Sequence, residues 1–202
     1  MKVLLKGYYG FGNLGDDVLM RVVYLWLRRL KKYEIDVYSG FTPNNGSYPT
    51  HFPSDYNHYI HNILADTPTL VDWTHKAEYD LVIQGGGGIH FDHSKGGNKY
   101  LMLNKLFEGI GVSAVAKSES VLRRLSNKKL NIAFKHKIGI GVGIGDFTKD
   151  GRNRIRHASA IRQYNYLWVR DSLSEHWLKR LGYKQKSFRA SDLAFKTESW
   201  IP

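Results

Sequence analysis

The residue types best suited to chemistry lie close together near the start of the chain. A glycine-rich stretch over residues 10–15 fits the pattern G-x-G-x-x-G, and two carboxylates, Asp16 and Asp17, follow it directly. Glycines let a backbone approach a ligand closely, and a carboxylate within hydrogen-bond reach of a hydroxyl can orient or deprotonate it. The pattern predicts a site in which the aspartates act on a substrate that is also held by Gly12, Asn13 and Gly15.

The same pattern is typical of dinucleotide-binding turns, but the residues around it favour another ligand. Asp16 and Asp17 put negative charge at a helix amino terminus, where a pyrophosphate would bind. Ser39 and Gly40 stand where the second strand should supply an acid for the ribose, and Asp36 comes too early. We therefore expect Asp16 to cap the helix and Asp17 to be free to orient a hydroxyl or a water; simple capping by both aspartates is the alternative.

Two further groups follow apolar runs that resemble buried strands. The first is a glycine run that would let the chain approach a substrate or form a tight crossover, comprising Gly85, Gly86, Gly87 and Gly88. The second is Arg170, whose guanidinium can hold a carboxylate or phosphate through two hydrogen bonds. A salt bridge to Asp171 is the alternative role for Arg170. Asp171 and Ser172 could bind substrate or cap the helix that follows.

Histidines near the glycine run raise the question of a metal site. His90, Asp92 and His93 could hold a metal ion through imidazole and carboxylate groups, or they could be ordinary loop residues. The other histidines show no ligand spacing, and the sequence has no G-x-S-x-G elbow of a serine hydrolase. We expect neither a metal ion nor a cofactor.

Hydrophobic patterning indicates the elements that would position these groups. Residues 3–5 form a short apolar run before a glycine, which is typical of a buried parallel strand. From Asp17 to Leu30 apolar residues recur at three- and four-residue spacing, which predicts an amphipathic helix. A second strand is predicted at 35–38. Residues 41–58 are rich in proline, asparagine and glycine, and they predict a long loop insertion.

The second half of the chain continues the alternation of strands and helices. Further strands are predicted at 81–83, 138–145, 166–169 and 188–195, with a helix at 173–181. This alternation indicates an α/β fold with a Rossmann-like, doubly wound parallel sheet. With 202 residues, 42% of them apolar, and no internal repeat, the chain is expected to form a single domain over 1–202.

Composition restricts the partners and the compartment. Thirty Lys and Arg against 18 Asp and Glu give a net charge of +12, which favours phosphorylated or polyanionic partners. There is no cysteine, no signal-peptide pattern and no apolar stretch of membrane-spanning length. We expect a cytoplasmic protein, for which peripheral contact with an anionic membrane surface is an option.

Five blocks, in order along the chain, resemble the polysaccharide pyruvyl transferase family. Residues 7–17 read G-Y-Y-G-F-G-N-L-G-D-D, which is similar to the family's usual G-Y-Y-G-x-G-N-x-G-D-E. The other blocks are residues 80–88 with Asp92, 143–145, 169–172 and 191–195. The order of the blocks is harder to reproduce by chance than any single block, and together they span nearly the whole chain.

The resemblance implies a fold similar to one half of a glycosyltransferase-B-type fold. It also implies transfer of pyruvate from phosphoenolpyruvate, as a ketal, onto two hydroxyls of a glycan or lipid-linked sugar in cell-surface glycan and exopolysaccharide biosynthesis. Asp16, Asp17 and Arg170 would be the catalytic residues. Family members usually continue into a second Rossmann-like half, whereas this chain ends at Pro202. Three alternatives follow: the chain is a truncated or divergent member, it obtains that half from a partner or a homo-oligomer, or it keeps the scaffold without the reaction.

Two other functions fit parts of the sequence. A nucleotide-dependent or nucleotide-sugar-dependent enzyme would use the glycine turn for its ligand. A non-catalytic binding module would keep the family scaffold and dock its basic surface onto an acidic partner or polysaccharide. Nucleic acid is not an expected partner, because Tyr164, Tyr166 and Trp168 fit a strand of the core better than a stacking surface.

Overall fold

The structure is a computed structural model that describes residues 1–10, 13–38, 56–71, 75–86, 88–90, 132–145, 147 and 152–191. Strands and helices alternate along these residues. In chain order they are β1 (Lys2–Lys6), α1 (Leu14–Arg29), β2 (Glu34–Tyr38), α2 (Tyr56–Leu64), β3 (Thr69–Val71), β4 (Ala77–Gly85), β5 (Gly88–His90), β6 (Ile132–Ile144), α5 (Arg152–Ile161), β7 (Tyr166–Val169), α6 (Ser172–Arg180) and β8 (Lys186–Arg189).

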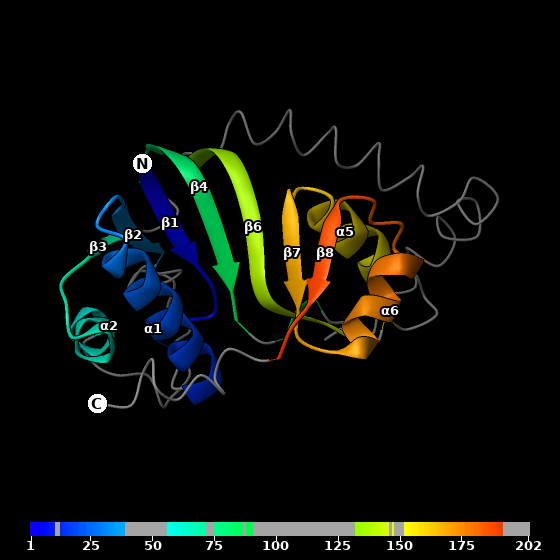
Figure 1. Cartoon of the computed structure of the whole chain (residues 1–202), viewed down its shortest axis with the longest axis horizontal. Helices are drawn as coiled ribbons and strands as arrows, with labels where there is room; N and C mark the ends of the chain where they lie inside the picture. Colours follow the sequence, from blue (N-terminus) through cyan, green and yellow to red (C-terminus); the bar gives the residue numbers. More distant parts are fainter. Residues whose placement is uncertain are drawn as a thin grey trace.

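The strands form one parallel sheet that runs across the whole molecule (Figure 1). Their order is β3-β2-β1-β4-β6-β7-β8, and β5 pairs with β6 off this path. Every recorded pairing is parallel. The order reverses between β1 and β4, which is the point where open α/β sheets bind ligands. The predicted Rossmann-like α/β class is therefore confirmed.

The first β-α-β unit forms as the sequence predicts. β1 and β2 pair from Lys2 with Glu34 to Leu5 with Val37. The helix between them begins at Leu14, three residues before the predicted start, because Asn13 has an extended backbone and serves as the N-cap residue. The acidic first turn and the basic last turn of α1 both complement the helix dipole.

The predicted loop over 41–58 is too long at its carboxyl end. Residues 56–58 belong to the first turn of α2, which packs through Ile60 and Leu64 against the core beside α1. Residues 41–55 lie outside the described residues. The prolines before residue 56 obscured the apolar spacing of this short helix, and the three-residue strand β3 that follows was not predicted either.

The remaining strands differ from the prediction mainly in length. β7 and α6 agree with it to within one residue at each end. β4 and β6 are longer than predicted, because they pair with each other from Ala77 with Ile132 to Gly85 with Ile140. β8 lies at 186–189 rather than 188–195, since its pairing follows the four residues of β7; residues 192–195 lie outside the described part. β5 and α5 were not predicted.

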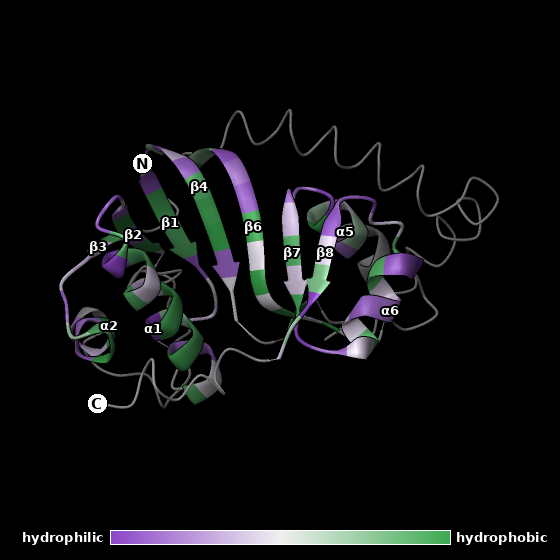
Figure 2. Ribbon diagram, in the orientation of Figure 1, coloured by the Kyte–Doolittle hydropathy of each residue, from purple (hydrophilic) through white to green (hydrophobic). Residues whose placement is uncertain are grey.

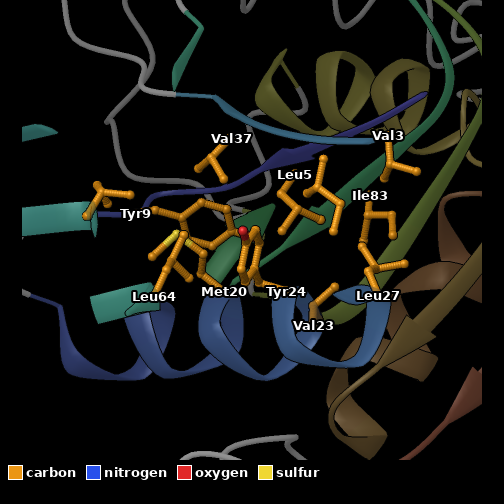
Figure 3. Packing of buried hydrophobic residues seen from close by; sticks show 12 residues of the cluster. Val3, Leu5, Tyr9, Met20, Val23, Tyr24, Leu27, Val37, Leu64 and Ile83 are labelled. Carbon is orange, nitrogen blue, oxygen red and sulfur yellow. The ribbon is translucent and has the colours of Figure 1, made fainter. Parts of the chain in front are cut away.

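Helices cover both faces of the sheet, which makes it doubly wound. On one face, Met20, Val23 and Leu27 of α1 pack on Leu5 and Ile83, as Figure 3 shows. On the other face, α5 and α6 pack on Leu167 of β7, with Ile161 and Leu178 in the same cluster. Figure 2 shows the hydrophobic colour along β1 and the central part of β4, whereas β6 begins hydrophilic and becomes hydrophobic. No helix among the described residues is long and apolar enough to cross a membrane.

Candidate active site at the carboxyl edge of the sheet

The two aspartates of the first turn lie where β1 ends and α1 begins. This is the carboxyl edge of the sheet, beside the reversal of strand order between β1 and β4. Both side chains are buried: Asp16 is 5% exposed and Asp17 is 3% exposed. Buried carboxylates are stable only with hydrogen-bond partners, so their surroundings determine what they can do.

Asp17 ties the turn to a helix that is distant in sequence. Its Oδ1 accepts a hydrogen bond of 2.6 Å from the backbone N–H of Gly10, and its Oδ2 accepts one of 3.1 Å from the hydroxyl of Tyr59 in α2. Burial raises the pKa of the Asp17 carboxyl above its usual value, although the hydrogen bonds from Gly10 and Tyr59 act in the opposite direction. A carboxylate whose pKa is raised accepts a proton more readily near neutral pH.

Asp16 lies against the end of the neighbouring strand. Its Oδ2 accepts a hydrogen bond of 2.7 Å from the side-chain amide of Asn13. A Cβ atom at Gly86 would lie 2.8 Å from Asp16 Oδ1, and Gly86 has a φ of +109°, so only glycine fits at this position. Gly86 is therefore glycine because the main chain packs against Asp16, whereas the predicted approach of the glycine run to a substrate stays a prediction.

The structure changes the helix-capping roles that the sequence predicts. Asn13, not Asp16, is the N-cap residue, and it makes no side-chain capping bond. Asp16 and Asp17 are the third and fourth residues of α1, and Asp17 is not free, since each of its oxygens has a partner. The reason is tertiary: the β1–α1 turn and α2 both fold back onto the carboxylate of Asp17.

Tyr9 is part of this site, and the sequence reasoning did not single it out. Its ring fills the space beside Gly7, where a side chain would collide with it, and its hydroxyl lies 2.7 Å from a Cβ position at Gly85. Tyr9 is 1% exposed, and burial together with Asp16 raises the pKa of its hydroxyl. Tyr9 therefore requires glycine at the carboxyl end of β1 and at the carboxyl end of β4. Tyr59 was also missed, because nothing in its local sequence marks it.

The other predicted glycines differ in how far the structure explains them. A Cβ at Gly15 would meet only Asn13 among the described residues, at an ordinary contact distance of 3.6 Å. Packing therefore does not explain why Gly15 is glycine. Gly88 begins β5 and pairs with Gly143. Gly12 and Gly87 lie outside the described residues.

Arg170 occupies the predicted place after β7 but is engaged locally. Its Nε lies 3.2 Å from Asp171 Oδ2, which is the alternative role that the sequence left open. Asp171 caps α6, because its Oδ1 accepts a hydrogen bond of 2.7 Å from the backbone N–H of Ser174. Burial raises the pKa of Asp171, but the bonds from Ser174 and Arg170 outweigh it and the net shift is downward. Ser172 is exposed in the first turn of α6.

Arg170 and the aspartate pair share one edge but do not touch. β4 and β6 separate β1 from β7, so the ends of the strands that carry them are three strand spacings, or roughly 14 Å, apart. Ser174, which the sequence reasoning missed, links α6 to the end of β6, because its Oγ accepts a hydrogen bond of 2.9 Å from Ile144 N. The edge therefore offers an acidic end and a basic end to a ligand that spans them.

His90 lies in β5 and contacts residues of two other segments. Its Nδ1 lies 3.1 Å from Nδ1 of His157, and its Nε2 lies 3.3 Å from the Tyr164 hydroxyl. Burial, with the charges of His157 and Lys137, holds the pKa of His90 well below its ordinary value. Within the described ranges no three potential ligands gather to hold a metal ion; Asp92 and His93 lie outside those ranges.

Asp36 is committed to the interior of the sheet. Its Oδ2 accepts a hydrogen bond of 2.7 Å from the Tyr79 hydroxyl and lies 3.4 Å from Lys2 Nζ. The side chain is 2% exposed in the middle of β2. It therefore does not reach the carboxyl edge, where a dinucleotide ribose would need an acid.

Comparison with known proteins identifies the family of the chain. The family model for polysaccharide pyruvyl transferase matches residues 13–202. The match begins inside the first of the five sequence blocks and includes Asp16, Asp17 and Arg170. A search of curated proteins and a search of solved structures gave no match. The family match covers almost all of the chain, and the chain belongs to the polysaccharide pyruvyl transferase family.

Proposed function

We propose that the protein transfers a pyruvyl group from phosphoenolpyruvate to two hydroxyls of one sugar and so forms a cyclic ketal. The observation that carries this proposal is the buried pair Asp16 and Asp17 at the strand reversal of a chain that belongs to the pyruvyl transferase family. The acceptor would be a glycan or a lipid-linked sugar of a cell-surface polysaccharide.

The chemistry determines what the site has to supply. The bond between C2 of phosphoenolpyruvate and the phosphate oxygen breaks, and two bonds form from C2 to sugar oxygens. One hydroxyl proton ends on the methylene carbon, which becomes a methyl group, and the other leaves with the phosphate. The balance needs no redox step. It needs a group that takes a proton from a hydroxyl and a cation that holds a carboxylate or a phosphate.

Asp17 is suited to the proton transfer. The burial that raises its pKa makes it a better base near neutral pH. Its two hydrogen bonds leave it accepting capacity, because a carboxylate has about four lone-pair sites. Asp16 and Asn13 next to it would orient the acceptor sugar.

Arg170 is suited to hold the donor. It lies at the same edge, with its side chain one-third exposed, and only its Nε is bonded to Asp171 among the described residues. The two terminal nitrogens would then face the carboxylate or phosphate of phosphoenolpyruvate.

The test is a calorimetric titration of the protein with phosphoenolpyruvate, NAD and a uridine nucleotide-sugar in parallel at low salt. We expect binding of phosphoenolpyruvate that Arg170→Ala abolishes and Arg180→Ala, in the last turn of α6, leaves intact. Binding of NAD or the nucleotide-sugar alone would replace this proposal with a nucleotide-dependent enzyme. If none of the three ligands binds, a non-catalytic binding module would be favoured.

A further inference from the structure

A second feature lies at the opposite end of α1, away from the aspartates. A groove with a volume of about 440 Å³ runs between the second half of α1 and the sheet face formed by β4, β6 and β7. Its walls are almost entirely apolar and include Trp26 and Leu30 of α1, Ile138 and Ile140 of β6, and Trp168 of β7. No described helix covers this part of the sheet face, because α5 and α6 pack on the other face.

A cationic pocket adjoins the groove. It is lined by Arg28, Arg29 and Lys31 together with Leu25 and Tyr33, and Tyr33 also lines the apolar groove. The positive φ of Lys31, 51°, turns the chain at the end of the helix. Leu30 lines the groove and is nevertheless 55% exposed, so the groove presents an apolar side chain to solvent.

The charge of this pocket is largely uncompensated. Arg28 pairs with Asp66 at 3.1 Å, and Glu34, another acid at this end of the molecule, pairs with Lys2 at 3.4 Å. No carboxylate of the described residues lies within ion-pair distance of Arg29, Lys31 or Lys32, and all three side chains are exposed. An anionic group bound here would therefore meet unpaired cations.

Apolar and cationic cavities that share one wall fit an amphipathic anion. We propose that this surface binds an anionic phospholipid of a membrane, with its headgroup at Arg29 and Lys31 and an acyl chain in the groove beside Trp26 and Trp168. Charge complementarity selects the headgroup, since lysine and arginine side chains are attracted to an anionic membrane surface. Trp26 lines the groove and Tyr33 lines both cavities, and tryptophan and tyrosine are enriched where a membrane meets water.

This inference does not depend on pyruvyl transfer. The lipid surface lies at the carboxyl-terminal end of α1, and the aspartates lie near its amino-terminal end; Arg29 is 12 residues, or about 18 Å, from Asp17 along the helix. A lipid held there would place the protein at a membrane surface without occupying the carboxyl edge of the sheet. The two sites can therefore be tested separately.

The test uses vesicles in which the acyl chains of every phospholipid are brominated, made of phosphatidylcholine with or without phosphatidylglycerol. We expect flotation with the anionic vesicles only, accompanied by quenching of tryptophan emission. Trp168→Phe with Trp26→Phe should remove most of that quenching, which would assign the quenching to these two residues. Arg29→Glu with Lys31→Glu should weaken vesicle binding at least tenfold. The matched control, Lys179→Glu with Arg180→Glu, makes the same charge change at the end of α6 and should weaken it far less.

Three results would overturn the inference. Equal binding to vesicles without phosphatidylglycerol would remove the role of charge. Flotation without quenching of Trp26 and Trp168 would show that no acyl chain enters the groove. Absence of flotation with anionic vesicles at low salt would show that this surface does not bind an anionic membrane.

Discussion

The main chain at Gly86 passes so close to Asp16 that a Cβ atom at position 86 would lie 2.8 Å from the carboxylate oxygen Oδ1. β4 therefore ends against the first turn of α1, and the glycine run and the aspartates form one structural unit. The contact also gives the two kinds of glycine at this edge different expected roles, because Gly86 is required by packing and Gly15 is not.

Gly86→Ala should destabilise the fold. The substitution combines a steric conflict with Asp16 and a backbone φ of +109° that alanine adopts poorly, so we expect a loss of about 2 kcal/mol or more in the free energy of unfolding. Chemical denaturation measures the loss. A stability equal to that of the wild type would show that β4 and Asp16 are not in contact.

Gly15→Ala should have the opposite effect on stability. The described neighbours leave room for a Cβ, and alanine favours a helix over glycine by about 0.5–1 kcal/mol. We expect this variant to be at least as stable as the wild type and to bind phosphoenolpyruvate or the sugar more weakly, because a methyl group would then face the ligand. Unchanged affinity and activity would remove Gly15 from the site.

Tyr59→Phe should act on Asp17 alone. In the wild type the hydrogen bond from the Tyr59 hydroxyl to Oδ2 lowers the pKa of Asp17. The substitution removes this bond, so the pKa of Asp17 should rise further and the acidic limb of the activity profile should move to higher pH. The free energy of unfolding should fall by about 1 kcal/mol. Tyr166→Phe, at an exposed tyrosine, is the control and should shift neither quantity.

Asp171→Asn should strengthen binding of phosphoenolpyruvate. Asparagine can still cap α6 by accepting the N–H of Ser174, but it no longer offers a carboxylate to Arg170. The guanidinium would then be more available to an anionic ligand. Asp171→Ala separates the two roles, since it should also cost about 1 kcal/mol of stability through loss of the cap. Weaker binding by the Asn variant would mean that Asp171 itself contacts substrate.

His90 should make stability fall in mild acid. Its pKa is depressed in the folded state, so the unfolded chain takes up a proton below its ordinary pKa of 6.5 while the folded chain resists. The neutral form of His90 therefore does not reduce the free energy of unfolding above about pH 6.5. Below that pH the free energy of unfolding declines, by up to about 1.4 kcal/mol per pH unit. The facing groups are His157, Tyr164 and Lys137.

Urea denaturation between pH 7 and pH 5 checks this prediction. The raised pKa of Asp17 has the opposite sign, because a carboxyl that favours its protonated form in the fold loses stability as pH rises. A comparison of the wild type with His90→Asn isolates the histidine, and His176→Asn, on the exposed side of α6, is the control. Identical slopes in the wild type and His90→Asn would contradict the prediction.

Local patterning was sufficient to predict the elements that carry their own signal. β1, α1, β2 and β7 have apolar periodicity or an apolar run bounded by turn residues, and they form where expected. β3 and β5 have three residues each and exist only through pairing with β2 and β6, so no local signal could reveal them. α2 lies close behind a proline-rich stretch that conceals its spacing.

The site shows the same division. The sequence pattern located Asp16, Asp17, Asp171 and Arg170, because each follows a strand or begins a helix. The sequence pattern did not show that Asp17 accepts a hydrogen bond from Tyr59, which is 42 residues away, or that Tyr9 packs against Gly7 and Gly85. These contacts arise when α2 and β4 assemble on β1, and they convert an aspartate that was expected to be free into a buried, bonded carboxylate.

The most direct test of the account is to incubate the protein with phosphoenolpyruvate and a panel of glycan and lipid-linked sugar acceptors, and to measure phosphate release together with the mass of the acceptor. We expect one phosphate to be released for each pyruvyl ketal formed. In Asp17→Asn, phosphate release and ketal formation should both be lost while binding of phosphoenolpyruvate is retained. Full transfer by Asp17→Asn would contradict the role assigned to that carboxylate. Phosphate release without any gain of mass on an acceptor would contradict pyruvyl transfer itself.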